Sequence, residues 1–92
     1  MHEIEFEDPI FGHVVVTFDG RVIEFFRAGL GSVHRMHVRQ LARVEQSGPD
    51  RRGNYTADFC PTKRGGFKLT VPGHEWPRVI AFVETIVRPQ QV

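Results

Sequence analysis

Cysteine, excess charge and long apolar segments are what this sequence has least of. Cys60 is the only cysteine among 92 residues, so no intrachain disulfide can form and no cysteine-based zinc site can assemble. The formal net charge is +1, from 12 basic and 11 acidic residues, whereas domains that bind nucleic acid or anionic membranes normally carry a basic patch and a high isoelectric point. The longest apolar runs, at residues 14–16 and 79–83, fall far short of the roughly 18 residues that span a bilayer.

Two features of the composition bear on the cellular compartment. A single cysteine is typical of proteins in a reducing compartment. The first residues of the chain are rich in acidic side chains, where a secretory signal would be basic and then apolar. We therefore expect a cytoplasmic protein without a transmembrane segment.

Size and composition predict one globular domain. A chain of 92 residues has room for one core but not for two, so residues 1–92 are expected to form a single domain. Hydrophobic residues make up 40% of the chain and charged residues 25%, which separates it from disordered sequences. The eight Phe are the unusual feature, and aromatic residues favour strands.

Alternation of apolar and polar residues with a period of two predicts strands over most of the chain as far as Val71. Asp19 and Gly20 separate two such runs, which predicts a β-hairpin whose two-residue turn has positive φ at both positions. Leu41 and Val44 are three residues apart, which suggests either a bulged strand or a single helical turn. The predicted strands lie near residues 3–7, 13–18, 21–27, 32–39, 54–60 and 67–71, and the segment from Leu41 to Ser47 is either a further strand or a helical turn.

The period of the apolar residues changes after Pro72 and Gly73. Between residues 75 and 88 it becomes three or four, which predicts a helix with one apolar face formed by Trp76, Val79, Ile80, Val83 and Ile86 or Val87. A strongly twisted meander leaves an apolar face or an open barrel mouth, which one amphipathic helix can cover. The predicted fold is mainly β (α+β): an antiparallel meander or partly open barrel of about six to seven strands, capped by one C-terminal α-helix.

Three segments and part of the helix carry a family resemblance. They are VVTFDGRVI at residues 15–23, VRQLARVE at 38–45 and GFKLTV at 66–71, with Phe82 and Val83 in the helix. Together with the closing helix they resemble the pleckstrin-homology-like (PH-like) superfold, and in particular small bacterial PH-like domains of unknown function. The resemblance covers nearly the whole chain and implies a module that binds lipids, peptides or proteins. Apart from Arg21, the first loop lacks the basic residues of phosphoinositide-binding members, which argues against inositol-phosphate recognition.

The residues that could carry catalysis or bind a metal do not form a recognisable pattern. His34 and His37 are three residues apart, and an odd offset places them on opposite faces of a strand. Ser32, Ser47 and Cys60 lie in turn or strand contexts without a nucleophile elbow. We therefore predict no catalytic residue, no metal site and no cofactor.

A contact surface is suggested by Phe25 and Phe26, because adjacent strand residues point to opposite faces of a sheet. With Phe25 in the core, Phe26 faces outward, as Val15 does on the neighbouring strand. A row of basic residues on one face of the next predicted strand completes the candidate partner-binding set: Val15, Phe26, Arg35, His37 and Arg39. Another chain, including a second copy, would cover the apolar members. Alternatively, they are covered by Ile4, Phe6, Ile10 or Phe11 from the N-terminal part of the chain.

Basic loop residues form a second candidate surface. Arg51 and Arg52 lie in one predicted loop, and Lys63 and Arg64 lie in another. Such loops can lie at the same end of a sheet, where the four charges would bind an anionic lipid headgroup or a nucleic-acid backbone. The alternative is that these are solvated turns, which commonly carry Lys and Arg.

The function predicted from these residues is non-enzymatic. We expect a binding or adaptor domain that recognises a protein or peptide partner, for example by adding a strand beside the helix. Peripheral binding of an anionic ligand through Arg51, Arg52, Lys63 and Arg64 is the alternative. A small hydrolase or metal enzyme built on the barrel is a third hypothesis.

Overall fold

Seven strands, a 3₁₀ turn and one α-helix follow one another in the computed structural model, which describes residues 2–63 and 66–87. The elements are β1 (His2–Asp8), β2 (Gly12–Phe18), β3 (Val22–Arg27), β4 (Gly31–His37), the 3₁₀ turn η1 (Val38–Gln40), β5 (Leu41–Ser47), β6 (Asn54–Pro61), β7 (Phe67–Pro72) and α1 (Trp76–Val87). Each predicted strand is present, so period-two alternation identified the β framework.

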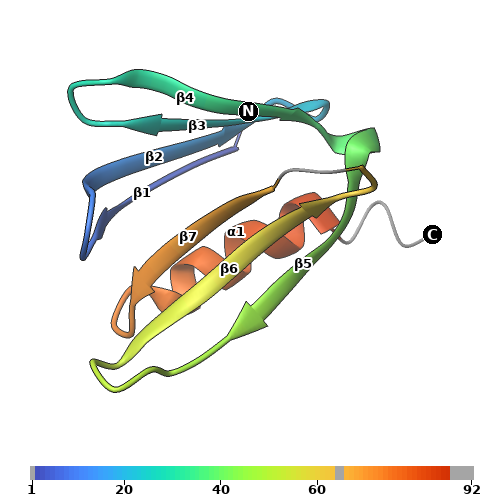
Figure 1. The fold of residues 1–92 in the computed structure, drawn as a ribbon. Helices are drawn as coiled ribbons and strands as arrows, with labels where there is room; N and C mark the ends of the chain where they lie inside the picture. Colours follow the sequence, from blue (N-terminus) through green and yellow to red (C-terminus); the bar gives the residue numbers. More distant parts are fainter. Residues whose placement is uncertain (1, 64–65, 88–92) are drawn as a thin grey trace.

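The strands form two antiparallel sheets in sequence order. The first sheet contains β1 to β4 and the second contains β5 to β7. Figure 1 shows the two sheets facing each other, with α1 beside the second sheet, where it contacts β1, β5 and β7. The antiparallel meander capped by one C-terminal helix is thus confirmed. The sheets are not closed into a barrel, because η1 turns the chain between β4 and β5 and these two strands do not pair.

Aromatic side chains join the two sheets. Phe25 of β3 is 0% exposed, and its ring meets the ring of Phe59 on β6 edge-on, with centroids 5.1 Å apart. The Phe25 ring also stacks on Phe67 of β7 at 4.5 Å, and the His34 ring of β4 stacks on Phe67 at 5.2 Å. Aromatic pairs at such distances add about 0.5–1.5 kcal/mol each to the stabilisation from burial. The core around them includes Ile4, Phe6, Val14, Val16, Phe18, Ile23, Leu69 and Val71.

The helix covers the open side of the sheets with one apolar stripe. Val79, Val83 and Ile86 are buried, as the three- and four-residue spacing predicts. Phe82 is buried as well, whereas Ile80 is only partly buried. The buried stripe is therefore displaced toward Phe82, because packing against the sheets decides which side of a broadly apolar helix faces inward.

The start of α1 is held by an aromatic stack. Trp76, the first helical residue, lies against Tyr55 of β6 with nearly parallel rings whose centroids are 4.8 Å apart. Pro77 follows in the first turn, where its missing N–H removes no helical hydrogen bond. The helix has 12 residues, and nowhere in residues 2–63 and 66–87 is a helix long and apolar enough to cross a membrane.

The hairpin between β2 and β3 is confirmed, but its turn differs from the predicted one. Gly20 has a φ of +99°, whereas Asp19 does not have positive φ. Instead, the Asp19 carboxylate accepts hydrogen bonds from the N–H groups of Arg21 and Val22, both at 2.8 Å. A side chain that bonds to the backbone two or three residues further on makes a wider turn than the two-residue type, so only the glycine adopts the left-handed region.

The strand predicted at residues 32–39 ends earlier than expected. β4 stops at His37, and Arg39 lies in η1 rather than in the strand. The placement of Arg39 on one strand face with Arg35 and His37 was therefore wrong. The pairing of β5 with β6 shifts register between Leu41 and Arg43, so the bulged strand is the correct alternative for this segment.

We expect Phe25→Ala to lower the free energy of unfolding by about 3–5 kcal/mol, because it removes the buried ring that packs between the sheets and leaves a cavity there. Phe11→Ala is the matched control, since it removes the same atoms from a side chain that is 53% exposed, and its cost should stay below about 1 kcal/mol. Urea unfolding followed by circular dichroism measures both. Similar losses for the two variants would contradict the position of Phe25 between the sheets.

Candidate functional site

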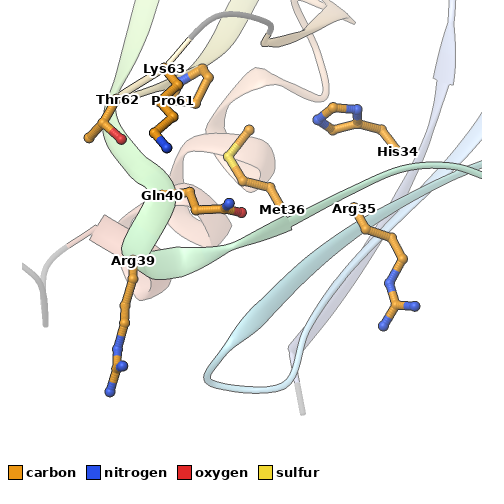
Figure 2. A pocket seen from close by; sticks show the side chains of 8 residues that line it. All are labelled: His34, Arg35, Met36, Arg39, Gln40, Pro61, Thr62 and Lys63. Carbon is orange, nitrogen blue, oxygen red and sulfur yellow. The ribbon is translucent and has the colours of Figure 1, made fainter.

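A hollow opens where the chain passes from the first sheet to the second. It has a volume of about 310 Å³ and is formed by the end of β4, by η1 and by the segment that leaves β6. Figure 2 shows the side chains that line it. We call it the sheet-junction pocket.

Local hydrogen bonds fix the two walls of this pocket. His37 Nδ1 accepts a hydrogen bond from the Arg39 N–H at 3.1 Å, and Gln40 Oε1 accepts one from the His37 N–H at 3.1 Å. This reciprocal pair is a capping box, which satisfies backbone donors at the start of η1. Across the pocket, the Thr62 N–H donates to the Gln40 carbonyl at 2.7 Å. The segment after β6 is therefore tied to η1.

Three of the residues that line the sheet-junction pocket are cationic: Arg35, Arg39 and Lys63. Figure 2 shows Lys63 extending toward Gln40, whereas the Arg35 and Arg39 side chains extend away from Met36 and Gln40, and no acidic side chain lines the pocket within residues 2–63 and 66–87. The Arg35 guanidinium is 3.7 Å from the Glu24 carboxylate but remains 67% exposed. Arg39 and Lys63 form no ion pair with any described residue. The pocket therefore has a local positive charge despite the near-neutral chain.

Less polar groups form the inner part of the pocket. Met36 is buried, Pro61 is partly buried, and the His34 ring is held by its stack on Phe67. Binding sites commonly combine apolar walls with a few charged groups that fix orientation. This arrangement suits a ligand with an anionic group and a short apolar portion.

Four of the five predicted partner-binding residues share one surface. Val15 and Phe26 lie opposite each other on β2 and β3, and both are partly buried. Arg35 and His37 alternate with buried positions on β4 and project to the same outward side of the first sheet. The fifth residue, Arg39, lies in η1 and, like Arg35, lines the sheet-junction pocket.

The hypothesis that N-terminal residues cover this outward surface is wrong. Ile4 and Phe6 of β1 are buried in the core, on the opposite side of the sheet from Phe26. Ile10 and Phe11 lie in the turn after β1 and are 70% and 53% exposed. Period-two alternation, once the register is known, sends the even-numbered residues of β1 inward, so they have no access to the outer face.

The two basic loops do not converge. Arg51 and Arg52 precede β6 and Lys63 follows it, so they lie at opposite ends of a strand of eight residues (Figure 1). A strand of that length spans about 25 Å. Arg64 lies outside the described residues. The expected single patch of four loop charges is therefore wrong, because the loops at the two ends of one strand cannot meet.

A group of potential metal ligands lies on the second sheet. Oxygen atoms of Glu45 and Asp58 and the sulfur of Cys60 lie within 4.8 Å of one another. Arg43 Nε already donates to Glu45 at 2.7 Å. Desolvation, together with the Asp58 and Glu45 carboxylates, raises the pKa of the Cys60 thiol above its ordinary value. Arg43, Glu45 and Cys60 thus form an ion pair beside a thiol whose protonated form is favoured.

Several pocket residues could not be identified from the sequence. Met36, Pro61 and Thr62 are ordinary strand or turn residues, and only the packing of the two sheets brings them together. His37 and Gln40 have the three-residue spacing of a capping box, but His is not one of the Ser, Thr, Asp or Asn residues that identify this motif in a sequence. The end of β4 and the pocket wall therefore became evident only in the structure.

An exposed apolar tip was also missed. Ile10, Phe11 and Leu30 are 70%, 53% and 69% exposed, and they belong to two turns at the end of the first sheet opposite η1. The Arg27 guanidinium carbon lies 3.8 Å from the centre of the Phe11 ring, a cation–π contact. Arg27 Nε is buried and has no hydrogen-bond partner in the described part of the chain. Turn residues fall outside the alternating segments, so periodicity gives no indication that they lie together.

A histidine on the outer face of the first sheet bridges two carboxylates. His13 Nδ1 lies 3.1 Å from the Glu7 carboxylate, and His13 Nε2 lies 3.2 Å from the Glu5 carboxylate. The hydrogen bond with Glu7 is the largest cause that raises the pKa of His13 above 6.5; desolvation opposes it and Glu5 adds to it. The protonated imidazole is therefore the form that this site favours.

We expect an NMR titration to place the pKa of His13 above 6.5. Because the folded state holds the proton more tightly, the stabilisation from this group is complete below pH 6.5 and is lost as the pH rises through the folded pKa. Glu7→Gln should lower the pKa. Glu3→Gln, on the same strand and without contact to His13, should leave it unchanged. An equal response to both variants would contradict the geometry.

No family model, no curated protein and no solved structure matches this chain. The pocket and the surfaces described above are therefore the features from which a function can be inferred.

Proposed function

We propose that this chain is a non-enzymatic, PH-like binding domain that recognises an acidic segment of a protein partner at the sheet-junction pocket. The observation that carries the proposal is the charge of the pocket: Arg35, Arg39 and Lys63 are among the residues that line it, and no described carboxylate does. All three cations are exposed, so an acidic segment that crosses the rim of the pocket can reach them. Hydrogen bonds between ionised partners are about twice as strong as neutral ones.

The element order supports the PH-like part of the proposal. Four antiparallel strands, then three, then one C-terminal helix are compatible with the resemblance found in the sequence. PH-like domains bind proteins, peptides or lipids, and a fold does not decide among ligands. The choice of ligand depends on the pocket.

An extended segment has a place to bind next to the pocket. β5 is an edge strand that pairs only with β6, and it contacts α1. The free backbone groups of an edge strand can pair with an added strand. Because β5 begins directly after η1, a segment paired with β5 beside the helix would lead toward the pocket.

The size of the pocket also favours a peptide side chain. Its volume of about 310 Å³ lies at the lower limit of the roughly 300–1,000 Å³ typical of small-molecule and cofactor sites. One or two side chains fill such a space. The candidate nucleophiles Ser32, Ser47 and Cys60 do not line the pocket.

Binding of a lipid headgroup or a nucleic-acid backbone is the alternative. A polyanion contacts several cations at once along a continuous surface. Arg51 and Arg52 are separated from Lys63 by the length of β6, so the basic side chains form separate groups. Arg35, Arg39 and Lys63 line one hollow, which fits a short carboxylate-bearing segment better. We place this binding in the cytoplasm, a proposal supported by the single cysteine.

A labelled peptide with a run of Glu residues tests the proposal. In NMR spectra of the ¹⁵N-labelled chain, we expect it to shift the amide signals of residues 38–41 and 61–63. The combined Arg39→Glu and Lys63→Glu variant should bind about tenfold more weakly, since two exposed ion pairs become repulsive. Arg51→Glu, the same charge change at the other end of β6, should bind like the wild type.

The alternative ligands are measured in the same way. A single-stranded oligonucleotide and vesicles of phosphatidylcholine with phosphatidylserine should bind more weakly than the peptide at about 0.15 M salt. If the peptide shifts residues 50–53 instead, or if the double variant binds it as tightly as the wild type does, the proposal fails. Tighter binding of the oligonucleotide or the vesicles would favour the alternative.

A further inference from the structure

The outward face of the first sheet has an ordered distribution of side chains. The outward residues of β1, at one edge, are three exposed carboxylates: Glu3, Glu5 and Glu7. β2 and β3, in the centre, place Val15 beside Phe26. β4, at the other edge, presents Arg35 and His37. The face therefore has carboxylates along one edge, basic side chains along the other, and the Val15–Phe26 pair between them, beside Thr17 and Glu24.

The strand register resolves this order into two neighbouring rows. The first row consists of Glu3, Thr17, Glu24 and Arg35. The second row consists of Glu5, Val15, Phe26 and Ser32. Each row begins with a carboxylate on β1 and ends with a hydrogen-bond donor on β4.

Consider a second copy whose outward face lies against this one, related to it by a two-fold axis that runs between the two sheets and parallel to the strands. The order of the strands in the second copy is then reversed, so β1 of each copy faces β4 of the other. Glu3 then faces Arg35 of the second copy, and Arg35 faces its Glu3. In the other row, Val15 faces Phe26 of the second copy, and the reverse contact forms as well. A two-fold axis across the strands would instead place β1 against β1 and bring like charges together, which is unfavourable. The charge pairs and the apolar contacts thus both favour the two-fold axis that is parallel to the strands.

We infer that this face packs against the same face of a second copy of this chain, around a two-fold axis parallel to the strands. Such an interface is self-complementary, as closed two-fold dimers require. Sheets that pack face to face lie about 10 Å apart with nearly aligned strands. At that distance Val15 and Phe26, which are partly exposed in the single chain, interdigitate with their counterparts.

The charges that would pair across the interface are accessible. Arg35 is 67% exposed, and its contact with Glu24 is long, at 3.7 Å. Glu3 has no ion pair among residues 2–63 and 66–87. Glu5 and Glu7 already share the His13 ring. Glu3 and Arg35 are therefore the principal pair, and it occurs twice in the dimer.

The area of this face limits the strength of the dimer. Four strands about 4.8 Å apart and about six residues long cover roughly 400 Å². Stable protein interfaces bury about 800 Å² on each partner. We expect a dissociation constant on the order of 0.1 mM, so the dimer forms in concentrated solution or where copies are held close together.

Charge reversal with complementation tests the inference. In sedimentation velocity at about 1 mM protein, above the expected dissociation constant, the wild type should behave as a monomer–dimer mixture. Glu3→Lys and Arg35→Glu should each be monomeric, since each change places like charges together at both contacts. An equimolar mixture of the two variants should associate again, because the two reversed side chains then face each other. Native mass spectrometry identifies this species as the heterodimer.

Two further variants separate this surface from the pocket. Phe26→Ser should also abolish association, and neither Glu3 nor Phe26 lines the sheet-junction pocket. Arg51→Glu, the same charge change in the loop between β5 and β6, should associate like the wild type, and circular dichroism reports whether each variant folds. A wild type that is monomeric at this concentration overturns the inference. So does a mixture that stays monomeric while the wild type dimerises, or association that neither reversal weakens.

Discussion

The Phe25 ring packs between the two sheets, and this contact positions the helix, the sheet-junction pocket and the outward face of the first sheet. Its ring meets Phe59 of β6 and Phe67 of β7, while its own strand carries Phe26 on the other face. Two small sheets with so few residues need a contact of this kind, because a domain of this size buries only about 60–65% of the surface of its unfolded chain. α1 then covers the side that the aromatic contact leaves open.

The position of this contact also determines where the sheets separate. The sheets are joined near Phe25, and the chain leaves β4 through η1 and enters β5 in the second sheet. The sheet-junction pocket lies at this separation, and the capping box of His37 and Gln40 fixes the start of η1, which forms one of its walls. The cations that line the pocket lie at strand ends and turns, where charged side chains reach water. The inner faces of the sheets therefore supply the packing, and their margins supply the exposed charge.

The outer face of the first sheet follows from the same alternation. Successive residues of a strand point to opposite faces of the sheet. Because Phe25 points inward to the aromatic contact, Phe26 must point outward. Val15 lies opposite Phe26, and acidic and basic strands flank the pair. Isolated apolar residues on a surface are ordinary. Here the apolar pair lies between an acidic strand and a basic strand. When a second copy is rotated by 180° about an axis parallel to the strands, its basic strand faces the acidic strand of the first copy.

Local periodicity determined most of the fold. The seven strands, the hairpin at Asp19, the bulge near Leu41 and the helix after Gly73 depend on spacing between near neighbours, which a sequence records directly. The outward position of Phe26 was predictable for the same reason. Only the tertiary structure showed that the strands form two sheets instead of a barrel. It also showed that Arg39 lies outside β4, at the pocket that Lys63 lines as well, and that Arg51 lies far from both. These outcomes depend on contacts between residues distant in the chain, whose geometry is set by packing and not by any local pattern.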